Sequence, residues 1–221
     1  MLSPYKGTFR VSQAYLHLRS DGTYHQGYDL VGISDKHIYS PVFGTVERAG
    51  WENPILHGQG FGQYVRIRIG ATGYRMYFGH LSGIAVKAGQ TVTPGTPLGI
   101  EGSTGHSTGS HLHLEIRNGT AKAGYVSVAD WADIPNTPSQ TAYTSTWREG
   151  LLGPDTLKRG ASSYPACLYN ATLQGLLGLS ADGIFGAGTE RAVKLYQAKH
   201  GLTADGKVGA MTKAALIGAG V

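Results

Sequence analysis

Apolar and polar residues alternate along much of the first 131 residues. In residues 64–69, Val and Ile occupy every second position and Tyr or Arg the positions between them. Residues 110–117 alternate in the same way, with Leu or Ile at every second position. Side chains two apart in a strand share a face. Both segments therefore predict half-buried strands, and the Gly and Pro residues around them predict tight turns between short strands.

The polar face of segment 110–117 has an unusual composition. It carries His111, His113, Glu115 and Arg117. A strand that needed only solubility would more often use Thr, Lys or Ser on this face. Two imidazoles on one face indicate a metal site, proton transfer, or both.

The pattern changes towards the C-terminus. Residues 132–155 lose all periodicity and include a Pro/Ser/Thr/Asn-rich stretch, which predicts a linker. Apolar residues then recur at helical intervals in residues 171–179 and 189–200. We therefore predict an N-terminal, mainly antiparallel β domain over residues 1–131 and a small all-α domain over residues 156–221.

An internal repeat lies within the helical part. Residues 181–193 recur as residues 204–216, with seven of thirteen positions identical. Each copy predicts an Asp-Gly turn, a short extended piece and a helix. We expect Thr189 and Thr212 to be the N-caps of these helices.

Composition and charge exclude several classes of protein. The single Cys167 excludes an intrachain disulfide framework. The net charge of +5 includes no Lys/Arg run and no basic stripe with interleaved aromatic residues, so nucleic acid is not an expected partner. Weak attraction to an anionic bacterial cell wall fits this charge. No segment approaches the roughly 18 apolar residues that span a membrane, and the first residues lack the apolar region of a signal peptide.

Other residues complete a candidate metal site. His25 and Asp29 stand four apart, and His80 follows another predicted strand. A hydrolytic zinc ion needs three nitrogen or oxygen ligands and one open position for water, whose pKa it lowers to roughly 7. His25, Asp29 and one of the two strand histidines supply such a set. His80 and the other strand histidine then fit proton transfer.

These motifs together resemble the lysostaphin-type zinc endopeptidases. The resemblance rests on His25-x-x-x-Asp29, on Gly79-His80-Leu81 and on His111-Leu112-His113, and it covers most of residues 20–120 in the same order. It implies an antiparallel β fold with an open groove. It also implies one zinc ion per chain, held by His25, Asp29 and His113, with His80 and His111 as the catalytic histidines.

Two features depart from the family pattern. Residues 51–60 form an extra stretch that we expect to lengthen a loop in the groove wall. The family often has a tyrosine upstream of its first ligand that supports the oxyanion. Tyr15 and Tyr24 are both candidates, and their spacing does not choose between them.

The repeated Asp-Gly-x-x-Gly-x-x-Thr units resemble a small three-helix peptidoglycan-binding module over residues 157–218. The resemblance implies binding to peptidoglycan. We interpret Asp182 and Asp205 as turn residues, because an EF-hand calcium site needs several oxygen ligands at fixed spacing. The alternative is that the module only stabilises the enzyme.

The sequence therefore predicts a monomeric, two-domain, zinc-dependent peptidoglycan endopeptidase that cleaves peptide cross-links, similar to a bacteriolytic, antimicrobial phage endolysin. Such a protein would stay in the host cytoplasm until a holin-type route releases it to the cell wall, or would be extracellular. Three alternatives stay open: a non-enzymatic relative that binds the wall or activates an amidase, an amidase that cuts between sugar and peptide, and a phage tail component. Gly–Gly, D-Ala–Gly and D-Ala–diaminopimelate are all candidate bonds.

Overall fold

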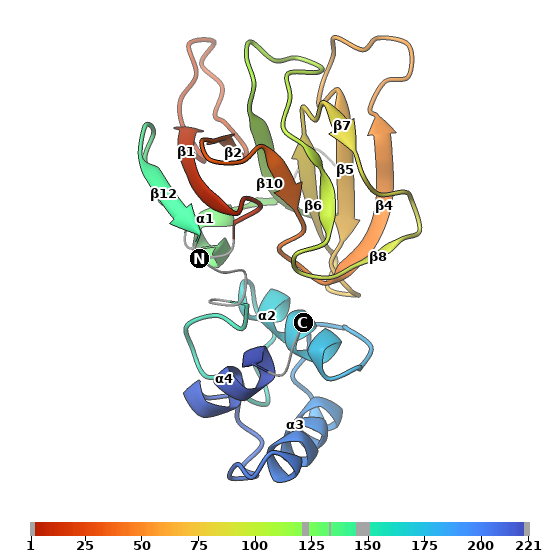
Figure 1. Cartoon of the computed structure of the whole chain (residues 1–221), viewed down its shortest axis with the longest axis vertical. Helices are drawn as coiled ribbons and strands as arrows, with labels where there is room; N and C mark the ends of the chain where they lie inside the picture. The colour runs from red at the N-terminus through yellow and green to blue at the C-terminus, as the bar shows by residue number, and fades with distance from the viewer. Residues whose placement is uncertain (1–2, 121–123, 133, 145–150, 219–221) are drawn as a thin grey trace.

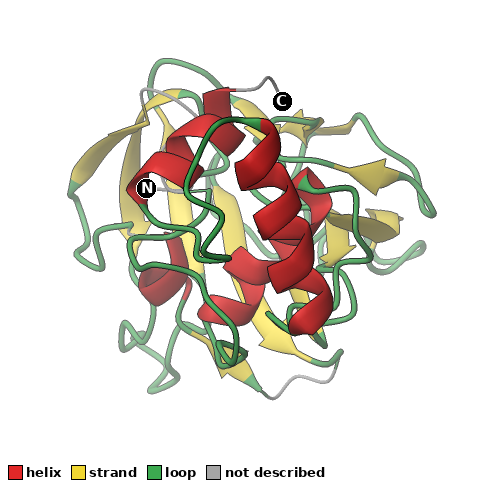
Figure 2. Cartoon of the chain, turned by 90° about the horizontal axis from the view of Figure 1, so that it is seen from below, coloured by secondary structure: helices red, strands yellow, loops and turns green. Residues whose placement is uncertain are grey.

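The computed structural model describes residues 3–120, 124–132, 134–144 and 151–218. A β-rich part is followed by a helical part, and the two lie one above the other (Figure 1). Seen from below, the helices lie across one end of the sheet (Figure 2). The predicted fold class, an antiparallel β domain followed by a small helical module, is confirmed. None of the helices in these ranges is both long and apolar enough to cross a membrane.

One large antiparallel sheet organises the N-terminal part. Its strands follow the order β12-β1-β2-β10-β6-β5-β4-β8. β11, which lies outside this order, also pairs with β10. A smaller sheet has the order β3-β9-β7. The bounds are β1 Gly7–Gln13, β2 Tyr28–Gly32, β3 His37–Tyr39, β4 Gly44–Trp51, β5 Gln63–Arg68, β6 Tyr74–Gly79, β7 Gly83–Ile84, β8 Thr91–Val92, β9 Pro97–Ile100, β10 Leu112–Asn118, β11 Tyr125–Val126 and β12 Thr141–Thr144. The short helix α1 is Val128–Ala132.

The two faces of the large sheet differ sharply. Leu114 pairs with Phe78, which in turn pairs with Val65, and all three are fully buried in the core. The neighbouring positions point the other way, where Glu115 pairs with Tyr77. The alternation read from the sequence therefore assigns the correct residues to the core, and the polar face of β10 is the face that carries the histidines.

The stretch predicted as a linker contains a strand. β12 pairs with β1 in the register Phe9↔Ala142 and Arg10↔Thr141, so it belongs to the sheet. Four residues are too few for a reliable period-2 signal, and the neighbouring Pro and Ser residues obscured it. Residues 145–150 of the same stretch lie outside the described residues. The division at residues 131 and 155 stays a prediction.

The helical module contains α2 Ala166–Leu176, α3 Ala187–Lys199 and α4 Ala210–Gly218. The prediction that Thr189 and Thr212 cap helices is wrong, because α3 begins at Ala187 after the N-cap Gly186, and α4 begins at Ala210. Both threonines lie in the first turn instead. Their hydroxyl groups are held in the interior, where they accept hydrogen bonds from glutamine side chains.

The repeat produces the same buried network twice. Gln174 Nε2 donates to Asp182 Oδ1 at 2.6 Å, and Gln174 Oε1 accepts from the backbone N–H of Gly183 at 2.8 Å. Gln197 makes the equivalent contacts to Asp205 at 3.0 Å and to the Gly206 N–H at 2.9 Å. Each Asp also accepts from the backbone two residues on. The interpretation of both aspartates as turn residues is confirmed.

The module contacts the sheet through Ala181, the first residue of the first repeat copy, and through Tyr164. The N–H of Ala71, in the β5–β6 turn, donates to the carbonyl of Ala181 at 2.7 Å. The ring of Tyr74 packs on Tyr164 with centroids 5.3 Å apart. These contacts lie at the end of β6 opposite to Gly79, which is the partner of His113. The module therefore leaves the histidine end of the sheet open.

A buried carboxylate joins three parts of the β domain. Glu101 Oε2 accepts from the hydroxyl of Tyr5 at 2.5 Å and from the N–H of Gly32 at 2.8 Å. Its Oε1 accepts from Lys36 at 2.6 Å and from Ser110 at 2.7 Å. Because Ser110 directly precedes His111, this cluster helps to fix the start of β10.

We expect Glu101→Gln to lower the free energy of unfolding by about 1–3 kcal/mol at pH 7, because an amide cannot accept all four hydrogen bonds. Burial raises the pKa of Glu101, but Lys36 and Tyr5 outweigh it, so the pKa lies below its usual range. This contribution is present above the unfolded-state pKa of about 4.3 and is lost as the pH falls further. Denaturant unfolding at pH 7 and at lower pH should show the variant approaching wild type in acid. An equal deficit at every pH would contradict this, and Glu190→Gln at an exposed ion pair is the control.

Candidate metal centre and active site

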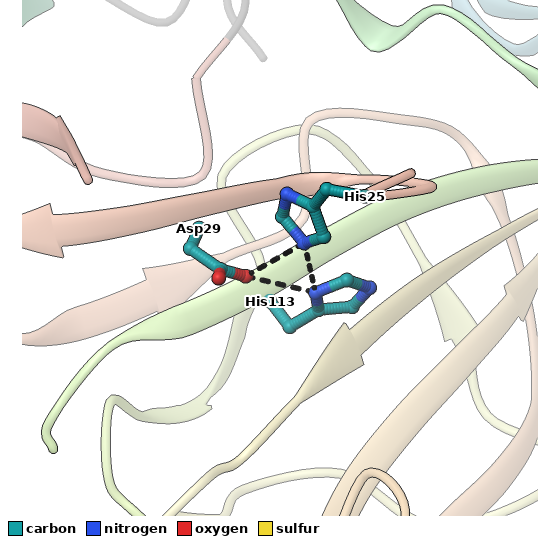
Figure 3. Close-up of side chains that lie close together, drawn as sticks. All are labelled: His25, Asp29 and His113. Carbon is teal, nitrogen blue, oxygen red and sulfur yellow. Dashed lines mark hydrogen bonds and ion pairs between the residues drawn. The ribbon is translucent and has the colours of Figure 1, made fainter. Parts of the chain in front are cut away.

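Two histidines and one aspartate converge at the histidine end of the sheet (Figure 3). Asp29 in β2 and His113 in β10 are direct cross-strand partners, and His25 lies just before β2. Asp29 Oδ1 lies 3.1 Å from His25 Nε2 and 2.8 Å from His113 Nδ1, and the two ring nitrogens are 3.1 Å apart. All three residues are buried. The sequence motif and the strand register thus bring one ligand atom of each residue to a common point.

Gly27 allows this approach. A Cβ atom at Gly27 would lie 2.6 Å from the carbonyl oxygen of Leu114 and 2.9 Å from His113 Nε2, distances that a real side chain cannot adopt. The backbone between His25 and Asp29 can therefore pass directly against β10 only because residue 27 has no side chain.

Each histidine of the cluster is oriented through its other ring nitrogen. His25 Nδ1 lies 3.1 Å from the carbonyl oxygen of Ala14, and His113 Nε2 lies 3.2 Å from Glu115 Oε2. Donation to these acceptors leaves His25 Nε2 and His113 Nδ1 as the atoms that face Asp29. Metal-ligating histidines commonly donate their second N–H to a carbonyl or carboxylate in this way.

The donor set fits a zinc ion. Tetrahedral zinc with bonds of about 2.0–2.1 Å places its ligand atoms about 3.3 Å apart, close to the separations in this cluster. Burial lowers the pKa of His113, but hydrogen bonds to Asp29 and Glu115 outweigh burial and raise it to about 9. Metal binding would therefore displace a proton from this ring.

The other two predicted histidines lie beside the cluster. The rings of His80 and His111 are 4.6 Å apart, and His80 lies 5.9 Å from His113. His80 Nδ1 is 2.8 Å from the carbonyl oxygen of Thr104, and His111 Nδ1 is 2.8 Å from that of Gly109. Burial, with a contribution from His111, lowers the pKa of His80 to about 4. His80 is therefore neutral at pH 7, with Nε2 able to accept a proton.

A cavity of about 240 Å³ opens beside these histidines. His80 and His113 line it, and Glu52 and Phe61 contribute from the segment around the extra stretch 51–60. His106 also lines the cavity. The expectation that the extra stretch contributes to the groove wall is consistent with this arrangement.

The tyrosine of the cavity is one that the sequence did not single out. Tyr125 lines the cavity, and neither Tyr15 nor Tyr24 does. Burial and the nearby Asp130, a residue of α1, raise the pKa of Tyr15. Asn118-Gly119 is a sequence signal for a turn, and a strand that returns after it and pairs with β10 would have placed Tyr125 beside Arg117.

Glu115 and Arg117 also line the cavity, although the sequence suggested no role for them. The two side chains form an ion pair and are both buried. The Arg117 guanidinium lies over the Tyr77 and Tyr125 rings, 4.4 and 4.9 Å from their centroids. The polar face of β10 is thus a continuous line from His113 through Glu115 to Arg117.

Comparisons with known proteins agree with this geometry. Residues 23–125 match the model of Peptidase family M23, and residues 168–216 match the model of the peptidoglycan binding domain. The first match contains all five histidine and aspartate residues of the site. The second contains most of α2 and α4 and all of α3.

Three curated relatives show where the similarity lies. An uncharacterized metalloprotease of Haemophilus influenzae is 40% identical over 98 residues, which are 44% of this chain and 19% of that protein. The peptidoglycan DD-endopeptidase ShyA of Vibrio cholerae is 49% identical over 55 residues, 25% of this chain and 13% of ShyA. Lysostaphin of Staphylococcus simulans is 30% identical over 155 residues, 66% of this chain and 30% of lysostaphin. The chain thus spans less than a third of the length of each relative.

Proposed function

We propose that this chain, which contains a domain of peptidase family M23 joined to a peptidoglycan-binding module, is a zinc-dependent endopeptidase that cleaves peptide cross-links of bacterial peptidoglycan. The observation that carries the proposal is the convergence of His25, Asp29 and His113 beside two further imidazoles, of which that of His80 lines the adjacent cavity. Two relatives support it: ShyA is named a peptidoglycan DD-endopeptidase, and lysostaphin matches 66% of this chain.

In this proposal His25, Asp29 and His113 hold one zinc ion per chain. Three protein ligands leave a fourth position open, which is the arrangement of catalytic rather than structural zinc sites. When bound, zinc supplies a Lewis acid for the substrate carbonyl and lowers the pKa of water to about 7.

His80 acts as the general base. Its Nδ1–H is held by the Thr104 carbonyl and its ring is neutral at pH 7, so Nε2 accepts a proton from the attacking water. His111 has a different role, that of a hydrogen-bond and proton donor. With one proton held by the Gly109 carbonyl, it donates from Nε2 only as an imidazolium cation. In that form it stabilises the negative charge that develops on the carbonyl oxygen and can protonate the leaving amine.

The module would hold the enzyme on its insoluble substrate and raise its local concentration there. Joining a lytic domain to a wall-binding module is the arrangement expected of an endolysin, and we extend the proposal to a monomeric, bacteriolytic enzyme of this kind. The duplicated Gln–Asp–Thr networks tie each Asp-Gly turn of the module to the helix that precedes it.

Mass spectrometry of digested cell walls with known bridge type tests the proposal. An endopeptidase converts cross-linked dimers into monomers and creates a new amino terminus within the bridge. The residues on both sides of the cut identify the bond: a new carboxyl-terminal Gly marks Gly–Gly cleavage, whereas a new carboxyl-terminal D-Ala marks D-Ala–Gly cleavage when a glycine amine is freed and D-Ala–diaminopimelate cleavage when a diaminopimelate amine is freed. An amidase would instead release stem peptides from the sugar and leave their cross-links intact.

Glu115→Gln is expected to weaken zinc binding about 10–100-fold, because an amide is a poorer acceptor for His113 Nε2–H than a carboxylate. Competition with a chromophoric chelator measures the change. Glu52→Gln is the matched control, since Glu52 lines the same cavity but bonds to the backbone of Phe61 instead of to a ligand. Wild-type zinc affinity in Glu115→Gln would show that Glu115 does not position His113.

A further inference from the structure

Three arginines lie side by side on the face of the sheet that carries His113. Arg117 in β10 pairs with Arg75 in β6, and Arg75 pairs with Arg68 in β5. Directly opposed residues on neighbouring strands project from the same face, and like charges at such positions destabilise a sheet. A row of three positive charges is therefore costly unless anions lie beside it.

The protein supplies too few anions for this row. Arg117 has its own partner, Glu115. Glu47 is shared by three guanidinium groups: its carboxylate lies 3.1 Å from Arg66 Nε, 3.3 Å from Arg75 Nε and 3.5 Å from Arg68 Nε. One carboxylate for three cations leaves an excess of two positive charges. We call Arg66, Arg68 and Arg75 the arginine patch.

The arginine patch is rigid and accessible. Arg68 Nη1 donates to the carbonyl of Gly70 and Arg75 Nη1 to the carbonyl of Gly73, both at 2.7 Å. These bonds fix the planes of the two guanidinium groups. The side chain of Arg68 is 41% exposed and that of Arg75 19%. A guanidinium has five N–H groups, so these contacts use only part of its donor capacity.

The arginine patch continues the floor of the catalytic cavity. Arg117 lines that cavity, and Arg75 is its direct neighbour on the next strand, about 5 Å away in the direction of the sheet. The ring of Tyr77 lies under both Arg117 and Arg66. A peptide strand that occupies the cavity and extends across the sheet would therefore reach the patch.

We propose that the arginine patch binds carboxylate groups of the stem peptides that flank the cross-link being cut. This inference rests on the proposed function. Stem peptides carry free carboxylates, and a planar guanidinium pairs with a planar carboxylate through two parallel hydrogen bonds. Since these carboxylates belong to the substrate strand itself, they lie within reach of the cavity, and their negative charge balances the excess on the patch.

The test compares the unmodified chain of 221 residues with Arg68→Gln/Arg75→Gln by cosedimentation with purified peptidoglycan freed of teichoic acids. We expect the double variant to bind about five-fold more weakly, the effect of losing roughly 1 kcal/mol of exposed ion pairing. Arg68→Gln alone, at the most exposed position, should show a smaller loss of binding. This single variant keeps the inference testable if the double variant does not fold. Arg10→Gln removes one exposed charge in β1, outside the arginine patch and the module, and should bind as wild type.

The same measurement on peptidoglycan whose carboxylates have been amidated completes the test. Wild type and Arg68→Gln/Arg75→Gln should bind this material equally. Equal binding of the two proteins to native peptidoglycan would overturn the inference. So would a difference that appears only when teichoic acids are present, since phosphate would then be the partner. Cleavage of native cross-links by wild type is followed in parallel: its absence refutes the proposed function, whereas cleavage with equal binding refutes only the patch.

Discussion

His113→Ala is expected to lose both its zinc and its cleavage of peptidoglycan. His113 provides one of three ligand atoms, and it is the residue that both Asp29 and Glu115 contact. Removing it leaves two ligands and two buried carboxylates without their partner. Loss of an outer-shell partner already costs 10–100-fold in metal affinity, so loss of a ligand should cost more than about 100-fold.

Elemental analysis of the desalted protein measures the zinc content directly. Wild type should contain one zinc per chain and His113→Ala almost none. His200→Ala, at an exposed histidine at the end of α3, is the control and should retain the metal. A His113→Ala protein that keeps one zinc per chain would show that the ion is bound elsewhere.

His111→Ala and His80→Ala should behave differently: both are expected to retain zinc and to lose activity. Their Nδ1 atoms are directed at backbone carbonyls, and neither belongs to the cluster of His25, Asp29 and His113. Loss of a general acid or base typically lowers kcat about 10²–10⁴-fold. The substrate KM should change little, because neither residue is assigned to substrate binding.

Zinc content and kcat are measured on the same preparations of both variants. His106→Ala is the matched control, because His106 lines the cavity but has no role in the proposed chemistry. Equal zinc depletion in His111→Ala and His113→Ala would refute the assignment of zinc binding to His113 and of catalysis to His111. Full activity in His80→Ala would show that His80 is not the general base.

The sequence was most informative where a pattern is local. The alternation in residues 64–69 and 110–117 predicts β5 and β10 to within two residues, because side chains two apart in a strand share a face. The prediction that β10 is half-buried is wrong, since its polar face is buried as well. The joint histidine motifs indicated five residues, and the fold brings these together at one end of the sheet. Helix α2 begins five residues earlier than predicted. Residues 167–174 are all buried, polar ones included, so this part of the helix has no exposed face that would give the sequence a helical period.

Features that depend on pairing between distant strands could not be predicted. Glu101 draws its four partners from Tyr5 to Ser110, and no local pattern marks it as a buried carboxylate. The arginine row exists only because β10, β6 and β5 pair in one register. Tyr125 reaches the cavity through a similar pairing with Arg117. In each case the chemistry depends on register, which sequence spacing does not supply.

The most direct test of the central claim follows cross-links in purified peptidoglycan. The chain of 221 residues is depleted of metal with a chelator and then supplied again with one equivalent of zinc, and the peptidoglycan fragments are identified by mass spectrometry at each stage. We predict that cross-linked dimers disappear and a new amino terminus arises within the bridge only when zinc is present. Cross-links that stay intact with zinc bound, or that are cut equally well without metal, would contradict the proposal.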